Sequence, residues 1–152
     1  MRCLGADILT KIILAIFRVN GCLLDAGDEL VKPLQLTSAR WQVIGAVALA
    51  GSPLSVPQIA AAMGITRQGI QKQLNVLLAD GLLTQYPNPG HKRSPLYTLS
   101  ERGAQIYGEV DCLQAGWANQ LADGLDSEKL KATLTTLEML HGRLAAQLKG
   151  DG

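Results

Sequence analysis

The segment from Ile59 to Leu78 constrains the fold more than any other part of the chain. It contains two short stretches with the apolar spacing of helices, separated only by Gly64-Ile65-Thr66. Ser55 is placed to cap the first helix and Thr66 to cap the second. Gly64 can adopt the positive φ that ends a helix. Two short helices joined by a glycine-containing turn of three to four residues form a helix-turn-helix unit.

The second helix of this unit, expected from Arg67 to Ala79, has two different faces. Ala60 is small enough to let the two helices approach, and four apolar residues are expected to hold the second helix on the core. These residues are Ile65, Ile70, Leu74 and Leu77. A helical wheel then leaves four polar side chains outward: Gln68, Gln71, Lys72 and Asn75.

This outward set suits the major groove of DNA. Gln and Asn can bond bidentately to adenine, and Lys reaches phosphate or guanine. Thr66 and the helix N-terminus favour phosphate, and Arg67 suits either contact. The alternative is the solvated face of an ordinary surface helix. The adjoining turn and the hairpin that follows favour the DNA-contacting interpretation.

Two strands are predicted next, at 82–86 and 96–99, with a loop between them that is punctuated by Pro and Gly. The loop is basic, because it contains His91, Lys92 and Arg93. An arginine on a long loop can enter a flanking minor groove, where the negative potential is concentrated. Arg93 is expected to take this role, with His91 and Lys92 on the DNA backbone. The alternative is a plain solvated turn.

The remaining chain is predicted to be helical, at about 7–24, from Thr37 or Ser38 to Ala50, at 101–121, and from a Ser127 cap onward. Gly21 and Gly27 are expected to weaken the first helix. The first and last helices carry apolar stripes, which predicts a homodimer formed through them, although a monomeric bundle would also cover them. The expected organisation is one domain, 1–152, with dimerisation helices at 1–36 and 101–152. The DNA-binding region is expected at 37–100.

Charge is unevenly distributed along the chain. Residues 66–102 contain five Lys/Arg against two acidic residues, whereas residues 103–152 contain four against seven. Residues 41–65 contain no charged side chain. A basic middle beside an acidic end indicates that only the middle faces a polyanion.

Several classes of protein are not indicated by the sequence. Three widely spaced cysteines and two distant histidines form no recognisable metal site, and no cofactor or catalytic motif is present. Charges interrupt the N-terminal apolar stretch, and Gly51-Ser52-Pro53 breaks the uncharged run, so neither a secretory signal nor a membrane span is predicted. A reducing, cytoplasmic setting is therefore expected. Cys22 and Cys112 lack basic neighbours in sequence, and we expect them to be buried packing residues rather than reactive thiols.

Several segments together resemble the MarR family of bacterial transcription regulators. They are Leu36 to Trp41, Ile59 to Leu78, Asp80-Gly81-Leu82, His91-Lys92-Arg93, and Leu99 to Gly103. The resemblance covers nearly the whole chain, and it implies a mainly α winged helix-turn-helix with a small β-hairpin and an obligate dimer on pseudo-palindromic DNA. It also implies a repressor that is released by a small aromatic or lipophilic ligand, or a regulator that responds to thiol oxidation. A winged-helix protein-interaction module without DNA binding is the remaining alternative.

Three residues depart from the family pattern. His91 stands where the family often has an Asp that braces the wing arginine. Gln73 lies toward the inner edge of the second helix, where an apolar residue is more usual. Gly69 costs that helix about 1 kcal/mol relative to Ala, and it is expected to permit close approach to a DNA backbone.

Overall fold

The structure is a computed structural model that describes residues 1–150. The chain divides into two compact units, Met1–Ala115 and Gly116–Gly152, and the last two residues of the second unit lie outside the described residues. Helix α5 (Glu101–Ala122) begins in the first unit and ends in the second.

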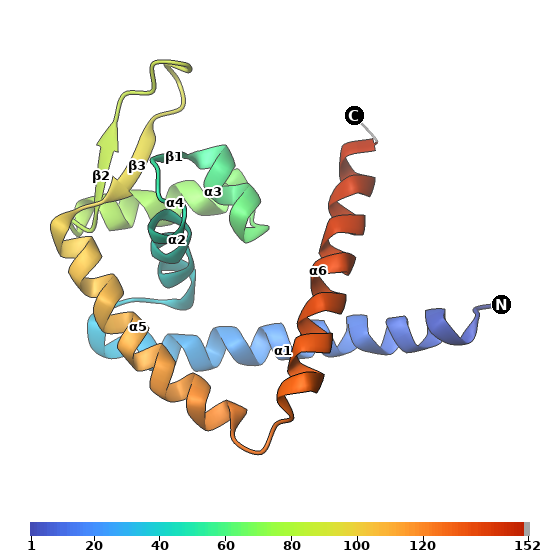
Figure 1. Ribbon diagram of the computed structural model, residues 1–152. Coiled ribbons are helices and arrows are strands. Elements are labelled where there is room, and N and C mark those ends of the chain that lie inside the picture. Colours follow the sequence, from blue (N-terminus) through green and yellow to red (C-terminus); the bar gives the residue numbers. More distant parts are fainter. Residues whose placement is uncertain (151–152) are drawn as a thin grey trace. The chain divides into compact units, whose positions relative to one another are not determined.

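The first unit is a mainly helical winged helix-turn-helix, as predicted (Figure 1). It starts with the long helix α1 (Leu4–Val31) and a single 3-10 turn, η1 (Lys32–Leu34). Helix α2 (Ser38–Leu49) and the helix-turn-helix pair α3 (Val56–Met63) and α4 (Arg67–Ala79) follow. Helices α2, α3 and α4 each contact a strand of a small sheet, and α1 packs on α2.

The sheet contains three antiparallel strands in the order β1-β3-β2. Strands β2 (Leu83–Tyr86) and β3 (Leu96–Leu99) form the predicted hairpin, in which Leu83 pairs with Leu99 and Tyr86 with Leu96. The short strand β1 (Leu54–Ser55) pairs with β3 on its other side and was not predicted from the sequence. It joins the start of α3 to the hairpin (Figure 1).

Local capping explains where the helix-turn-helix elements begin and end. The main-chain N–H of Ser55 donates to Oε1 of Gln58 at 2.9 Å, which fixes the start of α3. Gly64 ends α3 with φ +64°, and the Oγ1 of Thr66 accepts from the N–H of Gly69 at 3.2 Å to begin α4. The bounds predicted for α4 from its cap and from the glycine at position 81 are confirmed.

Helix α1 is longer than predicted, because it continues through both glycines to Val31. At Gly27 there is a tertiary reason for this. A Cβ at Gly27 would collide with the Oγ of Ser38. That hydroxyl donates to the carbonyl of Leu24 at 2.6 Å, and the main-chain N–H of Ser38 donates to Oδ1 of Asp28 at 2.7 Å. The absence of a side chain at Gly27 therefore lets α2 begin directly against α1. Thr37, rather than Ser38, is the cap of α2, since its Oγ1 accepts from the N–H of Arg40.

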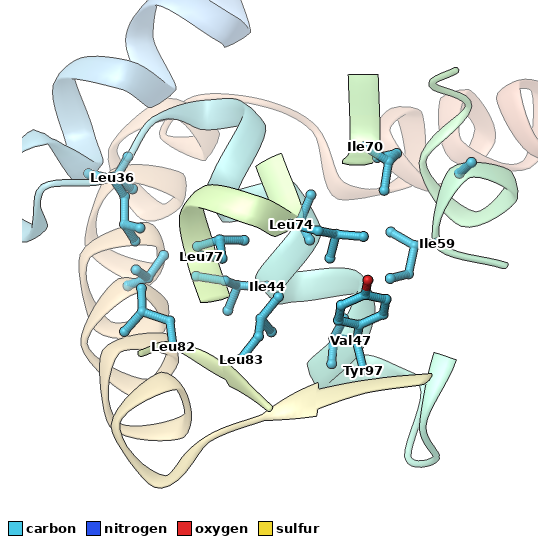
Figure 2. Close-up of a cluster of buried hydrophobic side chains, with 14 residues drawn as sticks. Leu36, Ile44, Val47, Ile59, Ile70, Leu74, Leu77, Leu82, Leu83 and Tyr97 are labelled. Carbon is cyan, nitrogen blue, oxygen red and sulfur yellow. The ribbon is translucent and has the colours of Figure 1, made fainter. Parts of the chain in front are cut away.

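A single aliphatic core joins these elements, and Tyr97 of β3 is its only aromatic member among the fully buried side chains of the described residues. Figure 2 shows Leu74 and Leu77 of α4, Ile44 of α2 and Leu83 of β2 converging between the helices and the sheet. Full burial stabilises each large aliphatic side chain by about 1.5–3 kcal/mol relative to leaving it exposed to water. The core thus fixes one face of α4 and leaves the other to solvent.

The second unit contains the end of α5, a turn at Gly124 with φ +75°, and helix α6 (Ser127–Gly150). The cap of α6 is Asp126, whose Oδ1 accepts from the N–H of Glu128 at 2.9 Å. The prediction that Ser127 caps this helix is wrong by one residue, because Ser127 already has helical conformation. Throughout residues 1–150, no helix combines the length and apolar character needed to cross a membrane.

Candidate nucleic-acid interface

The outward face of α4 has the predicted composition. Gln68, Gln71, Lys72 and Asn75 are exposed, whereas Ile70, Leu74 and Leu77 are buried. The Nε2 of Gln71 donates to Oδ1 of Asn75 at 3.0 Å, one helical turn away. This hydrogen bond joins the two carboxamides on the surface of the helix, and it leaves further donor and acceptor positions on each of them for another partner.

The N-terminus of α4 presents two more of the predicted residues. Thr66 is exposed and caps the helix, and Arg67 is exposed in the first turn. Gly69 is close to this cap, because an added Cβ would stand 3.3 Å from the Oγ1 of Thr66. The glycine thus also has a local role, in leaving room for the cap.

The wing loop, residues 87–95, connects β2 to β3 and extends away from the sheet (Figure 1). His91, Lys92 and Arg93 are all exposed there. The N–H of Ser94 donates to the carbonyl of His91 at 3.0 Å, so Lys92 and Arg93 occupy the two central positions of a tight turn. Both basic side chains therefore lie at the end of the hairpin.

A groove of about 490 Å³ lies between the wing loop and the helix-turn-helix. Arg67 and Gln71 of α4 line one side, and His91 and Arg93 line the other. Val56, at the start of α3, also lines the groove. The fold thus brings together two parts of the predicted site that are at least twenty residues apart in sequence.

Five of the nine predicted site residues are exposed but do not line this groove. They are Thr66, Gln68, Lys72, Asn75 and Lys92. Conversely, Asn88 lines the groove and was missed by the sequence analysis. The signal that could have revealed Asn88 is its position two residues before Gly90, since Asn side chains often bond the backbone two residues onward in turns.

Three expectations about apolar and thiol side chains are corrected by the structure. Ile65 does not pin α4 to the core, because it is 37% exposed in the turn. Cys22 and Cys112 are exposed rather than buried in the described chain. Gln73 is half-buried, consistent with its predicted place at the inner edge of α4. Within residues 1–150, no three His, Cys, Asp or Glu side chains gather in a way that could hold a metal ion.

Comparison with known proteins places the chain in a family. A family model described as the MarR family matches residues 34–94, which contain α2, the helix-turn-helix and most of the wing loop. The chain belongs to the MarR family. Proteins of Mycobacterium tuberculosis and Mycobacterium bovis, both described as uncharacterised, are 32% identical to it over 142 residues, which cover 93% of this chain and 98% of each relative.

Solved structures of MarR-family proteins share the fold over nearly the whole chain. A MarR-family transcriptional regulator from Rhodococcus sp. RHA1 superposes with a TM-score of 0.77 at 19% identity, covering 92% of this chain and 96% of the other. A cysteine-to-serine mutant of MarR from E. coli, solved in complex with operator DNA, has a TM-score of 0.76 at 21% identity, covering 91% and 99%. At these identities the likeness concerns the fold.

Proposed function

We propose that this MarR-family chain is a sequence-specific double-stranded DNA-binding transcription regulator. The observation that carries the proposal is the shared groove, in which Arg67 and Gln71 of the recognition helix α4 face His91 and Arg93 of the wing. Cationic side chains on both walls match the phosphate backbone, and the exposed carboxamides of α4 match base edges. The E. coli family member solved on operator DNA supports the same use of the fold here.

The roles proposed for the individual residues follow their positions. Gln68, Gln71 and Asn75 read bases in the major groove, while Thr66, Lys72, His91 and Lys92 contact phosphate. Arg67 contacts a base or a phosphate from the first turn of α4. Arg93 enters the flanking minor groove from the central part of its turn.

The proposed active form is a homodimer, built through segments 1–36 and 101–152. Helix α1 exposes a series of large apolar side chains, including Leu14, which is 54% exposed, and Phe17, which is 70% exposed. Helix α6 exposes another series, including Leu134 at 58%. Apolar surface of this extent on two helices indicates a protein interface. A twofold axis through it would present two copies of α4 to half-sites about 34 Å apart.

We also propose that the regulator is a repressor and that a small aromatic or lipophilic ligand releases it from DNA. This part rests on membership of the MarR family rather than on a located ligand site. A thermal-shift screen of small aromatic acids tests this part of the proposal. Each acid that raises the melting temperature is then assayed for release of the protein from DNA. Acids that stabilise the protein but leave the DNA complex intact would argue against ligand release.

The DNA-binding proposal is tested by anisotropy titrations of the purified dimer on genomic fragments that the wild-type protein selects. Arg93→Ala and Gln71→Ala should both weaken binding, and only Gln71→Ala should relax base preference. Gln105→Ala, which removes an exposed carboxamide from α5, is the matched control and should leave binding unchanged. Equal affinity of all four proteins at moderate salt would contradict the assigned surface.

A wild-type protein that binds no DNA even at low salt would favour the alternative of a protein-interaction module. Phosphate contacts make affinity fall steeply with salt concentration. The salt titration therefore separates the two functions directly.

A further inference from the structure

The wing loop contains two consecutive tight turns, 88–91 and 91–94, and the side chain of Asn88 bonds to both. The first turn is closed by the N–H of His91, which donates to the main-chain carbonyl of Asn88 at 3.1 Å. The second is closed by the N–H of Ser94, which donates to the carbonyl of His91 at 3.0 Å. Lys92 and Arg93 are the central residues of the second turn.

The side chain of Asn88 joins these two turns to each other. Its Oδ1 accepts from the N–H of Gly90 at 3.1 Å, within the first turn. Its Nδ2 donates to the carbonyl of Ser94 at 2.9 Å, at the end of the second turn. One carboxamide thus spans the loop from its first turn to the residue that follows Arg93.

These contacts fix the His91–Lys92 and Arg93–Ser94 peptide groups, which flank the Lys92-Arg93 pair, and the Ser94–Pro95 peptide group that follows. The carbonyl of His91 and the N–H of Ser94 are paired with each other, and the carbonyl of Ser94 is held by Asn88. Asn88 is only partly exposed, and it lines the same groove as Arg93 and Arg67. His91, which occupies the position where the family often has a bracing Asp, is exposed.

We propose that Asn88 is the positioning residue of the wing: it holds the two turns together and thereby orients Arg93 across the groove from α4. The effect of Asn88 on DNA affinity rests on the proposed DNA-binding function. The hydrogen bonds that Asn88 makes are present in the protein without DNA. A fixed loop loses less conformational freedom on binding than a mobile one. Fixing the orientation of Arg93 should therefore raise the affinity for DNA.

The first experiment measures amide hydrogen exchange in the free, full-length protein. Asn88→Ala should accelerate exchange of the Gly90 amide by about fivefold, the effect of losing one hydrogen bond. Asn88→Asp keeps an acceptor for Gly90 but cannot donate to Ser94, so it should restore protection at Gly90. Gln105→Ala, at an exposed position of α5, should leave exchange of the Gly90 amide unchanged. Unchanged exchange at Gly90 in Asn88→Ala would overturn the proposal, whether or not the protein binds DNA.

The second experiment is a double-mutant cycle on DNA that the wild-type protein selects. Asn88→Ala should weaken binding about fivefold in the wild-type background and have no further effect in the Arg93→Ala background, with the unfolding midpoint unchanged. Independent, additive losses would show that Asn88 does not act through Arg93. Failure of the wild-type protein itself to bind DNA would refute the proposed function instead, and the exchange data would then decide the role of Asn88 alone.

Discussion

Gly103 lies directly against the main chain of Leu82, so that a Cβ at position 103 would stand 3.0 Å from the Leu82 carbonyl carbon and closer still to its oxygen. The contact holds the beginning of α5 on the base of the wing. The Oγ of Ser100 caps α5 by accepting from the N–H of Gly103 at 2.9 Å, and it donates to the carbonyl of Gly81 at 2.6 Å. Two of these contacts, from Gly103 to Leu82 and from Ser100 to Gly81, therefore join the start of α5 to the residues just before β2.

Gly103→Ala is expected to destabilise the protein by about 3 kcal/mol, because backbone atoms of Leu82 must move to admit the methyl group. Gly108 on the same helix has nothing within 4 Å of an added Cβ. Gly108→Ala should therefore stabilise the protein by up to about 1 kcal/mol through helix propensity alone. Urea unfolding of both variants checks the contrast. Equal effects of the two substitutions would contradict the close approach.

Gly27→Ala is expected to destabilise the junction of α1 and α2 by about 2 kcal/mol. The new methyl group would displace the Oγ of Ser38 from its hydrogen bond to Leu24, which leaves a partly buried polar group unpaired. Gly45→Ala, at a position in α2 with open space for a Cβ, is the control and should be stabilising.

The pair of contacts at Gly27 also predicts a non-additive effect. Ser38→Ala removes the oxygen that Gly27→Ala would strike. The next atoms, Cζ3 of Trp41 at 3.4 Å and the Cβ of residue 38 at 3.5 Å, are at ordinary contact distances. The double variant Gly27→Ala/Ser38→Ala should lose less stability than the sum of the single variants. Strict additivity in urea unfolding would show that the two positions do not collide.

Local signals explain which parts of the fold could be predicted from the sequence. The bounds of α4 follow from Thr66 and Gly81, which act within a few residues, and its outward face follows from helical periodicity. The extent of α1 could not be predicted, because the reason for a glycine at position 27 is the hydroxyl of Ser38 on another helix. The two-residue strand β1 exists only through its pairing with β3, which is distant in sequence.

The candidate site also has one part that could be predicted from the sequence and another that could not. The sequence indicated the basic and carboxamide residues of α4 and the wing by their chemical type and spacing. It did not indicate that Arg67 and Arg93 line one groove, since this depends on how the hairpin packs beside the helix pair. Asn88 was missed because the donor half of its role needs Ser94, six residues away, to fold back toward it.

Two residues with nearly the same backbone conformation should respond oppositely to substitution. Gln35 has φ +58° and Gly64 has φ +64°, both in the left-handed region. Gln35→Gly should stabilise the protein by about 0.5–1 kcal/mol, because glycine lacks the steric penalty of a Cβ there. Gly64→Ala should destabilise it by about 1 kcal/mol, although its added Cβ would meet open space. Thermal unfolding measures both, and a destabilising Gln35→Gly would contradict the expected strain.

Lys72 and Gln71 are adjacent on the exposed face of α4 but should contribute to DNA binding in different ways. A lysine on phosphate releases counterions, so Lys72→Ala should reduce the slope of log affinity against log salt by about 1 for each half-site, or about 2 for a dimer. It should weaken binding to all sequences alike. Gln71→Ala should leave the slope unchanged and lower affinity only for the preferred sequence.

The hydrogen bond between Gln71 and Asn75 leads to a further expectation about base readout by Gln71. If the two carboxamides read bases as a pair, Asn75→Ala frees Gln71 to rotate, and both single variants should relax preference at the same base-pair position. Binding site selection with each variant at fixed salt measures the change. A salt slope that falls equally in Lys72→Ala and Gln71→Ala would contradict the division between phosphate contact and base readout on this helix.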